Sequence, residues 1–366
     1  MLSANQEFLL LLDAIGTTKT KILKFFEAAK GEEDFVKFFE KSSRNLFSEK
    51  EIKNIKTAIF EKIGAKTAQK LEKLHISCLF IDSEDYPERL REIDCPPVIL
   101  YFVGDKSILH EECIAIVGTR TPSAYGREVT ESFSKALVRA GLVTVSGLAF
   151  GLDGVAAIST LDAGGKTIAV LAGGLDKIYP ANHTNLARRI VKRGGLLLSE
   201  YLPEVEPQKY FFLSRNRIVA GLSRGLLVAE AGKKSGTLST VKFALDFGRE
   251  VFVIPGNITS AMSEGTNALI AEIPHCFTIS PSEVLLRLGI DSKNHGAKSS
   301  EKAQNLSDDE MKIIDILYID EKHFDELVEI TQFNPKTLAT LLTRMEINGL
   351  IKKLSGNFYA AVKNLK

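Results

Sequence analysis

Short apolar segments alternate with amphipathic helical segments between Cys113 and Gly256, and this alternation limits the folds that the chain can adopt. Nearly continuous apolar segments are typical of parallel strands that are covered on both faces. We predict strands at Cys113–Val117, Leu142–Ser146, Thr167–Leu171, Leu196–Ser199, Leu226–Ala229 and Val251–Ile254. Amphipathic helices are predicted between them, among others at Arg127–Ala140, Thr184–Val191 and Leu238–Phe247. The pattern therefore predicts a doubly wound, Rossmann-like α/β domain.

Three of the predicted strands run directly into loops that are rich in glycine and hydroxyl side chains. The loops read GTRTPSAYG from Gly118, SGLAFGLDG from Ser146 and KSGTLST from Lys234. A helix that follows such a loop points its free N–H groups outward, and glycine lets a ligand approach the backbone, so the loops favour a phosphate ligand. Arg120 adds a planar charge to the first loop. Taken alone, each loop is a weak signal, because close packing of a helix on a strand also demands glycine, and only the convergence of several loops at one edge favours a ligand site.

The segment KYFFLSRNRIVAGLSR combines four basic residues with three aromatic ones. Its basic residues are Lys209, Arg215, Arg217 and Arg224, and Tyr210, Phe211 and Phe212 stand beside the first of them. Cations that neutralise phosphates and an aromatic face that stacks on a base are together typical of a site for single-stranded nucleic acid. The alternative is a helix whose aromatic side chains lie in the core and whose arginines pair with Glu200, Glu204 or Glu206.

The remainder of the chain predicts three further parts around this domain. Residues 1–75 are expected to form a small helical domain, since apolar residues recur there at helical spacing between turn-like glycines. The following strand, turn, short helix and strand extend the sheet, so that the extended Rossmann-like domain spans 76–290. The polar run 291–305 is expected to be a linker. Residues 306–366 have the order of a winged helix, and their first helix opens with a capping box of Ser307 and Glu310.

Composition and motif spacing exclude several classes of function. Lys plus Arg total 47 and Asp plus Glu total 46, so any basic site must be local. The four cysteines form no CxxC pair, which argues against zinc and against a disulfide framework, and we expect them to be small core residues. The GxGxxG and Walker motifs are absent, so we expect no nucleotide cofactor, no metal and no catalytic residue. No segment is long and apolar enough to span a membrane, which predicts a cytoplasmic protein.

The motifs of the central domain resemble those of the DprA/Smf (DNA-processing protein A) family. GTRTPSAYG, SGLAFGLD, FLSRNRIVAGLS, VAEAGKKSGTLST and VFVIPG occur in the family's order, and YPERLREIDCPPVILYFVG is similar to its lead-in segment. The resemblance implies a helical (SAM/HhH-like) N-terminal domain, an extended Rossmann-like domain and a C-terminal winged helix. It also implies a non-enzymatic protein that binds and protects incoming single-stranded DNA in natural transformation (competence), loads the RecA recombinase onto it, and acts as a homodimer. Single-strand binding protein is expected as a further partner.

The same resemblance implies which residues contact DNA. Arg120, Lys209, Arg215 and Arg217 are expected to hold phosphates, and Phe212 is expected to pack against a base or sugar. Carried over by motif position, the predicted DNA-binding residues are Gly118, Thr119, Arg120, Ser146, Gly147, Lys209, Phe212, Arg215, Asn216, Arg217, Ser235, Gly236 and Thr237.

Two alternatives remain open at this point. One is a nucleotide hydrolase of Rossmann type, similar to nucleoside monophosphate phosphoribohydrolases, with Glu230 as its proton-transfer group. Those enzymes carry a PGGxGTxxE loop, whereas here PGN at 255–257 and SGT at 235–237 are separate. In the other alternative, the winged helix recognises duplex DNA with its third helix. The acidic residues of that module oppose contact with phosphates, and a role in binding protein is equally compatible with the sequence.

Overall fold

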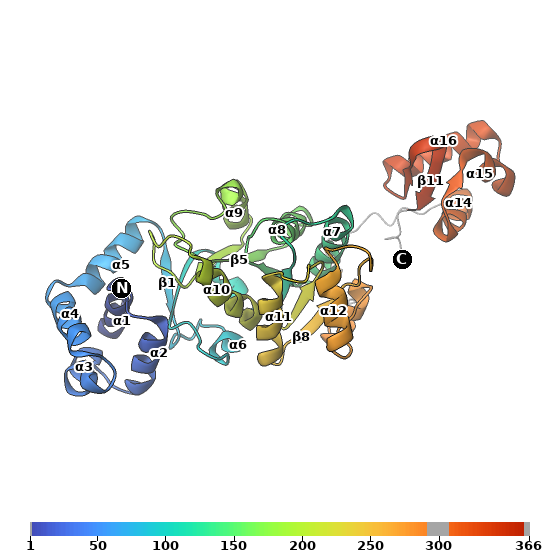
Figure 1. Cartoon of the computed structure of the whole chain (residues 1–366). Coiled ribbons are helices and arrows are strands. Elements are labelled where there is room, and N and C mark those ends of the chain that lie inside the picture. The colour runs from blue at the N-terminus through green and yellow to red at the C-terminus, as the bar shows by residue number, and fades with distance from the viewer. Residues whose placement is uncertain (1, 291–306, 362–366) are drawn as a thin grey trace. The chain divides into compact units, whose positions relative to one another are not determined.

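The structure is a computed structural model, and it describes residues 2–290 and 307–361 (Figure 1). The chain divides into two compact units, Met1–Ala297 and Lys298–Lys366. The first unit contains both the helical N-terminal region and the central sheet, and the second contains the winged helix. The predicted linker, 291–305, lies outside the described residues.

The N-terminal region is a cluster of helices around an aromatic core. Its helices are α1 (Ala4–Ala14), α2 (Lys19–Ala28), α3 (Phe35–Ser42), η1 (Ser43–Asn45), α4 (Glu49–Phe60) and α5 (Ile63–Lys73). The buried ring of Phe8 packs against those of Phe25 and Phe39. Gly64 lies inside α5, where a Cβ atom would come within 2.1 Å of the Glu7 carbonyl oxygen on α1. A glycine is therefore required at this crossing of α1 and α5.

The central sheet has eight strands in the order β1-β2-β6-β5-β4-β3-β7-β8. The six strands from β6 to β8 in this order are parallel, and β2 and β1 are added antiparallel at the β6 edge. The strands are β1 (Ser77–Phe80), β2 (Ile99–Gly104), β3 (Cys113–Val117), β4 (Val143–Ser146), β5 (Thr167–Leu171), β6 (Leu196–Ser199), β7 (Gly225–Val228) and β8 (Glu250–Val253). The predicted Rossmann-like sheet and its antiparallel extension are thus confirmed.

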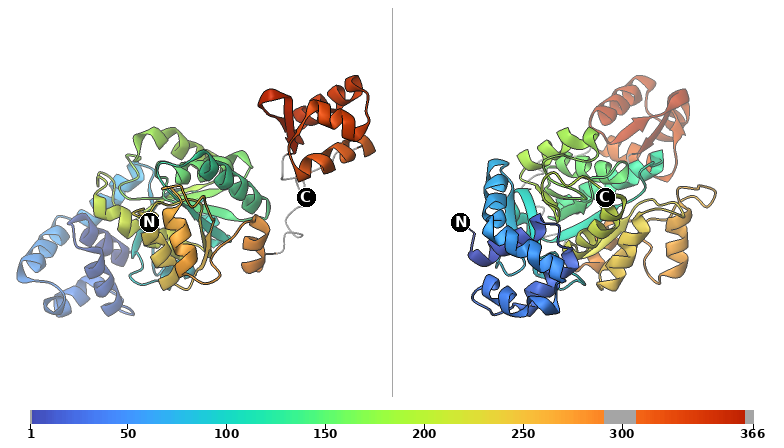
Figure 2. Two further views of the ribbon diagram at one scale, coloured as in Figure 1. Left: turned by 45° about the vertical axis from the view of Figure 1, so that its right-hand side comes forward. Right: turned by 60° about the vertical axis from the view of Figure 1, so that its left-hand side comes forward.

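Helices cover both faces of the sheet (Figure 2). Alternate residues of β3 enter different cores, because Ile114 and Ile116 pack with α7 and α13 while Ala115 and Val117 belong to the core that includes α10 and α11. This burial on two sides explains the continuous apolar character of the strands. The helices of this region are α6 (Glu88–Arg91), η2 (Lys106–His110), α7 (Ala124–Arg139), α8 (Leu152–Asp162), η3 (Ala181–His183), α9 (Thr184–Lys192), α10 (Lys209–Leu222), α11 (Thr237–Asp246), α12 (Glu264–Glu272) and α13 (Pro281–Arg287).

The second unit has the predicted winged-helix order of three helices followed by a hairpin. It contains α14 (Asp308–Ile319), β9 (Lys322–His323), α15 (Phe324–Thr331), α16 (Pro335–Ile347), β10 (Ile351–Lys353), η4 (Ser355–Asn357) and β11 (Phe358–Ala361). The Ser307 and Glu310 capping box begins α14 as predicted. Among the residues that the structure describes, no helix has the length and apolar character needed to cross a membrane.

One cysteine departs from the prediction that all four lie in the core. Cys113 and Cys276 are buried and Cys78 is half-buried, but Cys95 is exposed. Burial raises the pKa of Cys78 and Cys113 to about 12. Cys95 stands in the turn before Pro96 with a φ of 54°, and its carbonyl oxygen accepts a hydrogen bond from Arg217 Nε at 3.0 Å. The backbone of this residue, and not its thiol, faces the protein interior.

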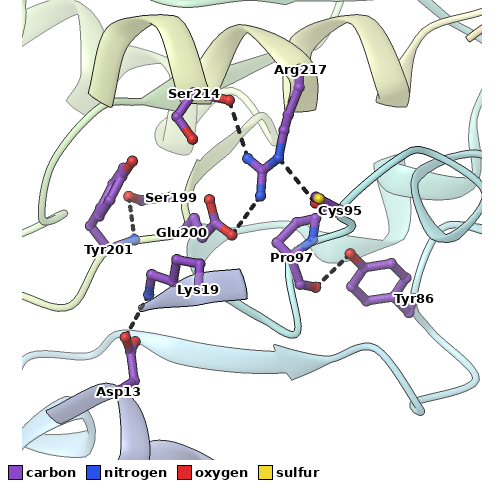
Figure 3. Close-up of polar contacts among 10 residues, drawn as sticks. All are labelled: Asp13, Lys19, Tyr86, Cys95, Pro97, Ser199, Glu200, Tyr201, Ser214 and Arg217. Carbon is purple, nitrogen blue, oxygen red and sulfur yellow. Dashed lines mark hydrogen bonds and ion pairs between the residues drawn. The ribbon is translucent and has the colours of Figure 1, made fainter. Parts of the chain in front are cut away.

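A buried carboxylate joins the helical region to the sheet. The Tyr101 hydroxyl on β2 donates to Asp13 Oδ2 at 2.6 Å, and Lys19 Nζ donates to Asp13 Oδ1 at 2.6 Å (Figure 3 shows the Lys19 contact). Burial, together with the neighbouring Asp13, raises the pKa of Tyr101 well above its usual value, which keeps its hydroxyl protonated as a donor. The contact therefore fixes α1 against the added edge of the sheet.

We predict that Tyr101→Phe lowers the free energy of unfolding by about 1–3 kcal/mol, because one oxygen of the buried Asp13 carboxylate loses its donor. Urea unfolding followed by circular dichroism measures the change. Tyr125→Phe is the matched control, since the Tyr125 hydroxyl donates to the Pro255 carbonyl at 2.8 Å from an exposed position. Equal losses of stability in the two variants would contradict the prediction.

Candidate nucleic-acid interface

The strand order places a groove at the carboxyl edge of the sheet. The sheet continues through β4, β5 and β6 on one side of β3 and through β7 and β8 on the other, so the loops after β3 and β7 diverge. Divergence of this kind opens a crevice beyond the strand ends in doubly wound sheets. A groove of about 810 Å³ lies there, lined by the loops that follow β3, β4 and β7 and by α10.

Most of the predicted site residues meet in this groove. The loops after β3 and β4 contribute glycines, and the loop after β3 also contributes Arg120. The opposite wall consists of α10 and the loop before α11. The predicted residues that line the groove are Gly118, Thr119, Arg120, Gly147, Lys209, Phe212, Arg215, Asn216, Ser235, Gly236 and Thr237.

Exposed cations and one aromatic ring form the accessible surface of the groove. Arg120 and Lys209 are exposed, and the Arg120 guanidinium carbon lies 5.3 Å from the centre of the Phe212 ring. Lys233 and Lys234 are also exposed and line the same groove. Within residues 2–290 and 307–361, none of these four cations has a carboxylate oxygen within 4.0 Å. Their charges are therefore available to an anionic ligand.

Arg215 lies in the floor of the groove and its guanidinium is used within the protein. The residue is 4% exposed, and its Nη1 donates to the carbonyl oxygen of Gly147 at 2.6 Å and to that of Val170. Burial lowers the pKa of Arg215 to about 10, and the nearby Asp153 carboxylate opposes this shift. Arg215 remains charged at neutral pH and connects α10 to the ends of β4 and β5.

The glycines of the groove have different physical roles. At Gly147 a Cβ atom would lie 2.2 Å from the Arg215 guanidinium nitrogens, and at Gly118 it would lie 2.4 Å from Leu152 Cδ1. These two glycines therefore make room for neighbouring side chains of the protein itself. A Cβ atom added at Gly236 would meet no neighbouring atom within 4 Å, so the backbone before α11 is open to a ligand.

Polar contacts hold α11 with its first turn at the groove. Gly236 precedes the helix without a side-chain cap, and Ser235 Oγ accepts from Thr237 N at 3.3 Å. Asn216 Nδ2 on α10 donates to Ser239 Oγ at 2.9 Å, which ties the two helices together. The positive end of the α11 dipole is thus directed to the same space as the exposed cations.

Two predicted site residues lie away from the groove lining. Ser146 is buried, and its Oγ accepts from Leu148 N at 3.4 Å. Arg217 forms a buried ion pair with Glu200 at 2.6 Å and also donates to the carbonyl oxygens of Cys95 and Ser214 (Figure 3). The pairing with Glu200 is the arrangement that the sequence left open as an alternative for this arginine.

Glu230, the candidate proton-transfer residue of a hydrolase, is also outside the groove lining. It is 2% exposed, and its carboxylate accepts from Ser123 N at 2.9 Å and from Ser123 Oγ at 2.6 Å. Its role in the fold is to hold the loop that begins α7. In the described ranges no group of three or more His, Cys, Asp and Glu side chains is arranged to hold a metal ion.

Sequence reasoning missed several residues of the groove. Lys233 and Lys234 precede the Ser235–Thr237 segment inside the motif VAEAGKKSGTLST, so a basic pair next to a helix start was the signal for them. Leu213 and Met262 also line the groove, and nothing in their local sequence indicates it.

We predict that Arg215→Gln lowers the free energy of unfolding by about 3 kcal/mol or more, because two carbonyls lose their donor and the buried Asp153 loses its cationic neighbour. Arg120→Gln is the matched control and should change stability by less than about 0.5 kcal/mol, since Arg120 is exposed. Urea unfolding measures both. A similar change in the two variants would show that the buried contacts of Arg215 do not stabilise the fold.

Comparison with known proteins assigns the chain to a family. The family model described as DNA recombination-mediator protein A matches residues 77–288, and the DprA winged helix domain model matches 297–357. The DNA processing protein DprA of Bacillus subtilis (strain 168) is 43% identical over 198 residues, which are 54% of this chain and 66% of that protein. Protein Smf of Escherichia coli (strain K12) is 42% identical over 207 residues, 57% of this chain and 55% of that protein. The aligned part of the chain thus spans less than two thirds of each relative.

Two solved structures are also similar. The X-ray structure of DNA processing protein A from Streptococcus pneumoniae aligns with a TM-score of 0.64 and 35% identity, covering 78% of this chain and 98% of that one. A structure of DNA processing protein A from Helicobacter pylori, described for its single-stranded DNA binding mode, aligns with a TM-score of 0.53 and 34% identity, covering 58% of this chain and 95% of that one. The predicted family is confirmed, and the chain belongs to the DNA recombination-mediator protein A (DprA/Smf) family.

Proposed function

We propose that the protein is a recombination mediator that binds single-stranded DNA in the groove at the carboxyl edge of its sheet. The observation that carries this proposal is the combination, in one groove, of the Phe212 ring with exposed cations that have no carboxylate partner among the described residues. The similarity to the Helicobacter pylori protein, whose structure is described for single-stranded DNA binding, supports it.

In this proposal Arg120, Lys209, Lys233 and Lys234 hold the phosphates of the strand. The Phe212 ring packs against a base or sugar, and the open backbone at Gly236 receives a phosphate at the start of α11. Arg215 and Asn216 hold the elements that carry these groups, through Gly147 and Ser239, whereas Ser146 and Arg217 are buried outside the groove lining and contact no DNA. Since stacking on an aromatic face accepts every base, binding is expected to be independent of sequence.

The proposed role continues beyond binding. The protein protects incoming single-stranded DNA in natural transformation and loads RecA onto it in the cytoplasm, with RecA and single-strand binding protein as partners and a homodimer as the acting form. Neither a cofactor nor a metal nor a catalytic residue is required. The hydrolase alternative has little support from the site, because Glu230 is buried and bonded to Ser123 outside the groove lining.

The first test is fluorescence anisotropy of labelled single-stranded and duplex oligonucleotides at several salt concentrations. We predict tight, salt-sensitive binding that prefers the single strand. The Arg120→Ala, Lys209→Ala double variant should bind about tenfold or more weakly, and its slope of log K against log salt should fall by roughly 0.7 for each phosphate that the variant no longer neutralises.

Two controls make this test specific. Arg188→Ala, Lys192→Ala removes the same two charge types from exposed positions on α9, outside the groove, and should bind as the wild type does. A chain ending at residue 290 keeps all the described residues of the first compact unit and should retain single-strand binding. Loss of binding on this truncation would assign DNA binding to the winged helix, and absence of binding by the wild type would contradict the proposal.

The mediator role has its own test. We predict that the wild-type protein shortens the lag of RecA-dependent ATP hydrolysis on DNA coated with single-strand binding protein, because it must hold the strand while RecA nucleates. The Arg120→Ala, Lys209→Ala variant should leave the lag unchanged. A wild-type protein that binds DNA and yet does not shorten the lag would refute RecA loading while leaving DNA binding in place.

A further inference from the structure

A second hollow continues from the groove along the carboxyl ends of β4 and β5. This recess is lined by residues that follow these two strands and by Lys177, Tyr179 and Pro207. It shares Arg120 and Phe212 with the groove, so the two hollows form one continuous surface. None of the site residues that were predicted from the sequence lies in the part of the recess beyond Phe212.

An aromatic side chain stands beside Phe212 in this recess. Tyr179 is 51% exposed, and its ring centre lies 5.6 Å from that of Phe212 with an angle of 64° between the two planes. Arg120 in turn lies over the Phe212 ring. A cation and two rings therefore follow one another along the surface. About half of the Tyr179 surface is therefore accessible to a ligand.

The charge changes sign just beyond Tyr179. Lys177 is exposed and lines both the recess and an outer hollow that adjoins it. That outer hollow is also lined by Asp176, Glu204 and Glu206. Asp176 and Glu206 disfavour a further phosphate, whereas Glu204 is paired with Lys70, and Lys177 is the outermost of the described cations that line the recess and the outer hollow.

We propose that Tyr179 and Lys177 form a second nucleotide subsite, in which a base stacks on the Tyr179 ring and the adjoining phosphate contacts Lys177. The inference rests on the proposed binding of single-stranded DNA, and it gives the strand a path from Lys234 past Arg120 and Phe212 to Tyr179. The carboxylates of the outer hollow end that path. The subsite takes any base, because it offers a ring face and a cation and no pattern of donors.

A single tryptophan provides the direct test, because the chain contains no tryptophan. Tyr179→Trp keeps an aromatic face and places the only indole of the protein at the subsite. Its fluorescence is followed while oligothymidylates of about 4 to about 16 nucleotides are added, lengths that span typical single-strand site sizes. Phe60→Trp is the control, since Phe60 is 88% exposed at the end of α4 in the helical region.

Quenching of Tyr179→Trp with the same midpoint as the anisotropy of labelled DNA, and no quenching of Phe60→Trp, is the expected result. Binding seen by anisotropy without quenching at Tyr179→Trp would overturn the subsite and leave the proposed function standing. Absence of DNA binding in the wild type would overturn both.

Substitutions that remove the ring and the charge give a second, independent measurement. Tyr179→Leu should weaken binding of the longer oligonucleotides by roughly 5-fold to 100-fold, while Tyr179→Phe should bind as the wild type does. Lys177→Gln should lower the salt slope by about 0.7, whereas Lys192→Gln on α9 should not. Because Lys177 is exposed, its substitution is compatible with folding. Wild-type affinity in Tyr179→Leu together with an unchanged slope in Lys177→Gln would refute the subsite.

Discussion

The buried guanidinium of Arg215 holds together the elements that form the groove. It donates to the Gly147 carbonyl, while the Gly147 N–H donates to the buried Asp153 carboxylate at 2.9 Å, so the loop after β4 is held on both sides of one residue. The loop after β4 is in turn bonded to the loop after β3, because Leu152 N donates to the Thr119 carbonyl at 3.2 Å. The loop after β3 is bonded to the segment after β7, because Thr119 N donates to the Glu230 carbonyl at 2.7 Å. The three loops that follow β4, β3 and β7 thus form one hydrogen-bonded series.

This arrangement separates the cations of the site into two classes. Arg215 and Arg217 are desolvated and bonded to carbonyls or to Glu200, and removal of either leaves buried groups without partners. Arg120 and the lysines of the groove are exposed and keep their charges for a ligand. Arg215 fixes the shape of the groove and Arg217 holds another face of α10, while in the proposed function the second class supplies the attraction for phosphate. A local cluster of this kind is effective in a chain whose net charge is only +1, because salt screens carboxylates that lie more than about 8 Å away.

The sequence predicted the strands well because each is buried on both faces and ends in a clear loop. The prediction for β3 matches the structure, and the predictions for β7 and β8 are displaced by one residue. The roles of the arginines in α10 were harder to predict, because the sequence does not distinguish an arginine in a buried ion pair from one in a binding site. Helical geometry does contain a signal: Lys209, Phe212, Leu213 and Asn216 are spaced to share the face that lines the groove. Arg217 lies about 200° around the helix from Arg215, so the two cannot serve the same surface.

The extension of the sheet has a related physical consequence for the groove. β2 pairs with β6, and β1 pairs with β2, so the edge of the parallel strands on that side is covered by antiparallel strands. The buried contact of Tyr101 with Asp13 then attaches the helical region to this added edge, and Lys70 on α5 pairs with Glu204 at 2.5 Å beyond β6. Glu204 is one of the carboxylates of the outer hollow. The helical region therefore contacts the sheet domain at two places of different strength: the buried Tyr101–Asp13 contact fixes α1 on the added edge, whereas the exposed Lys70–Glu204 pair only adjoins the acidic border at which the proposed strand path ends.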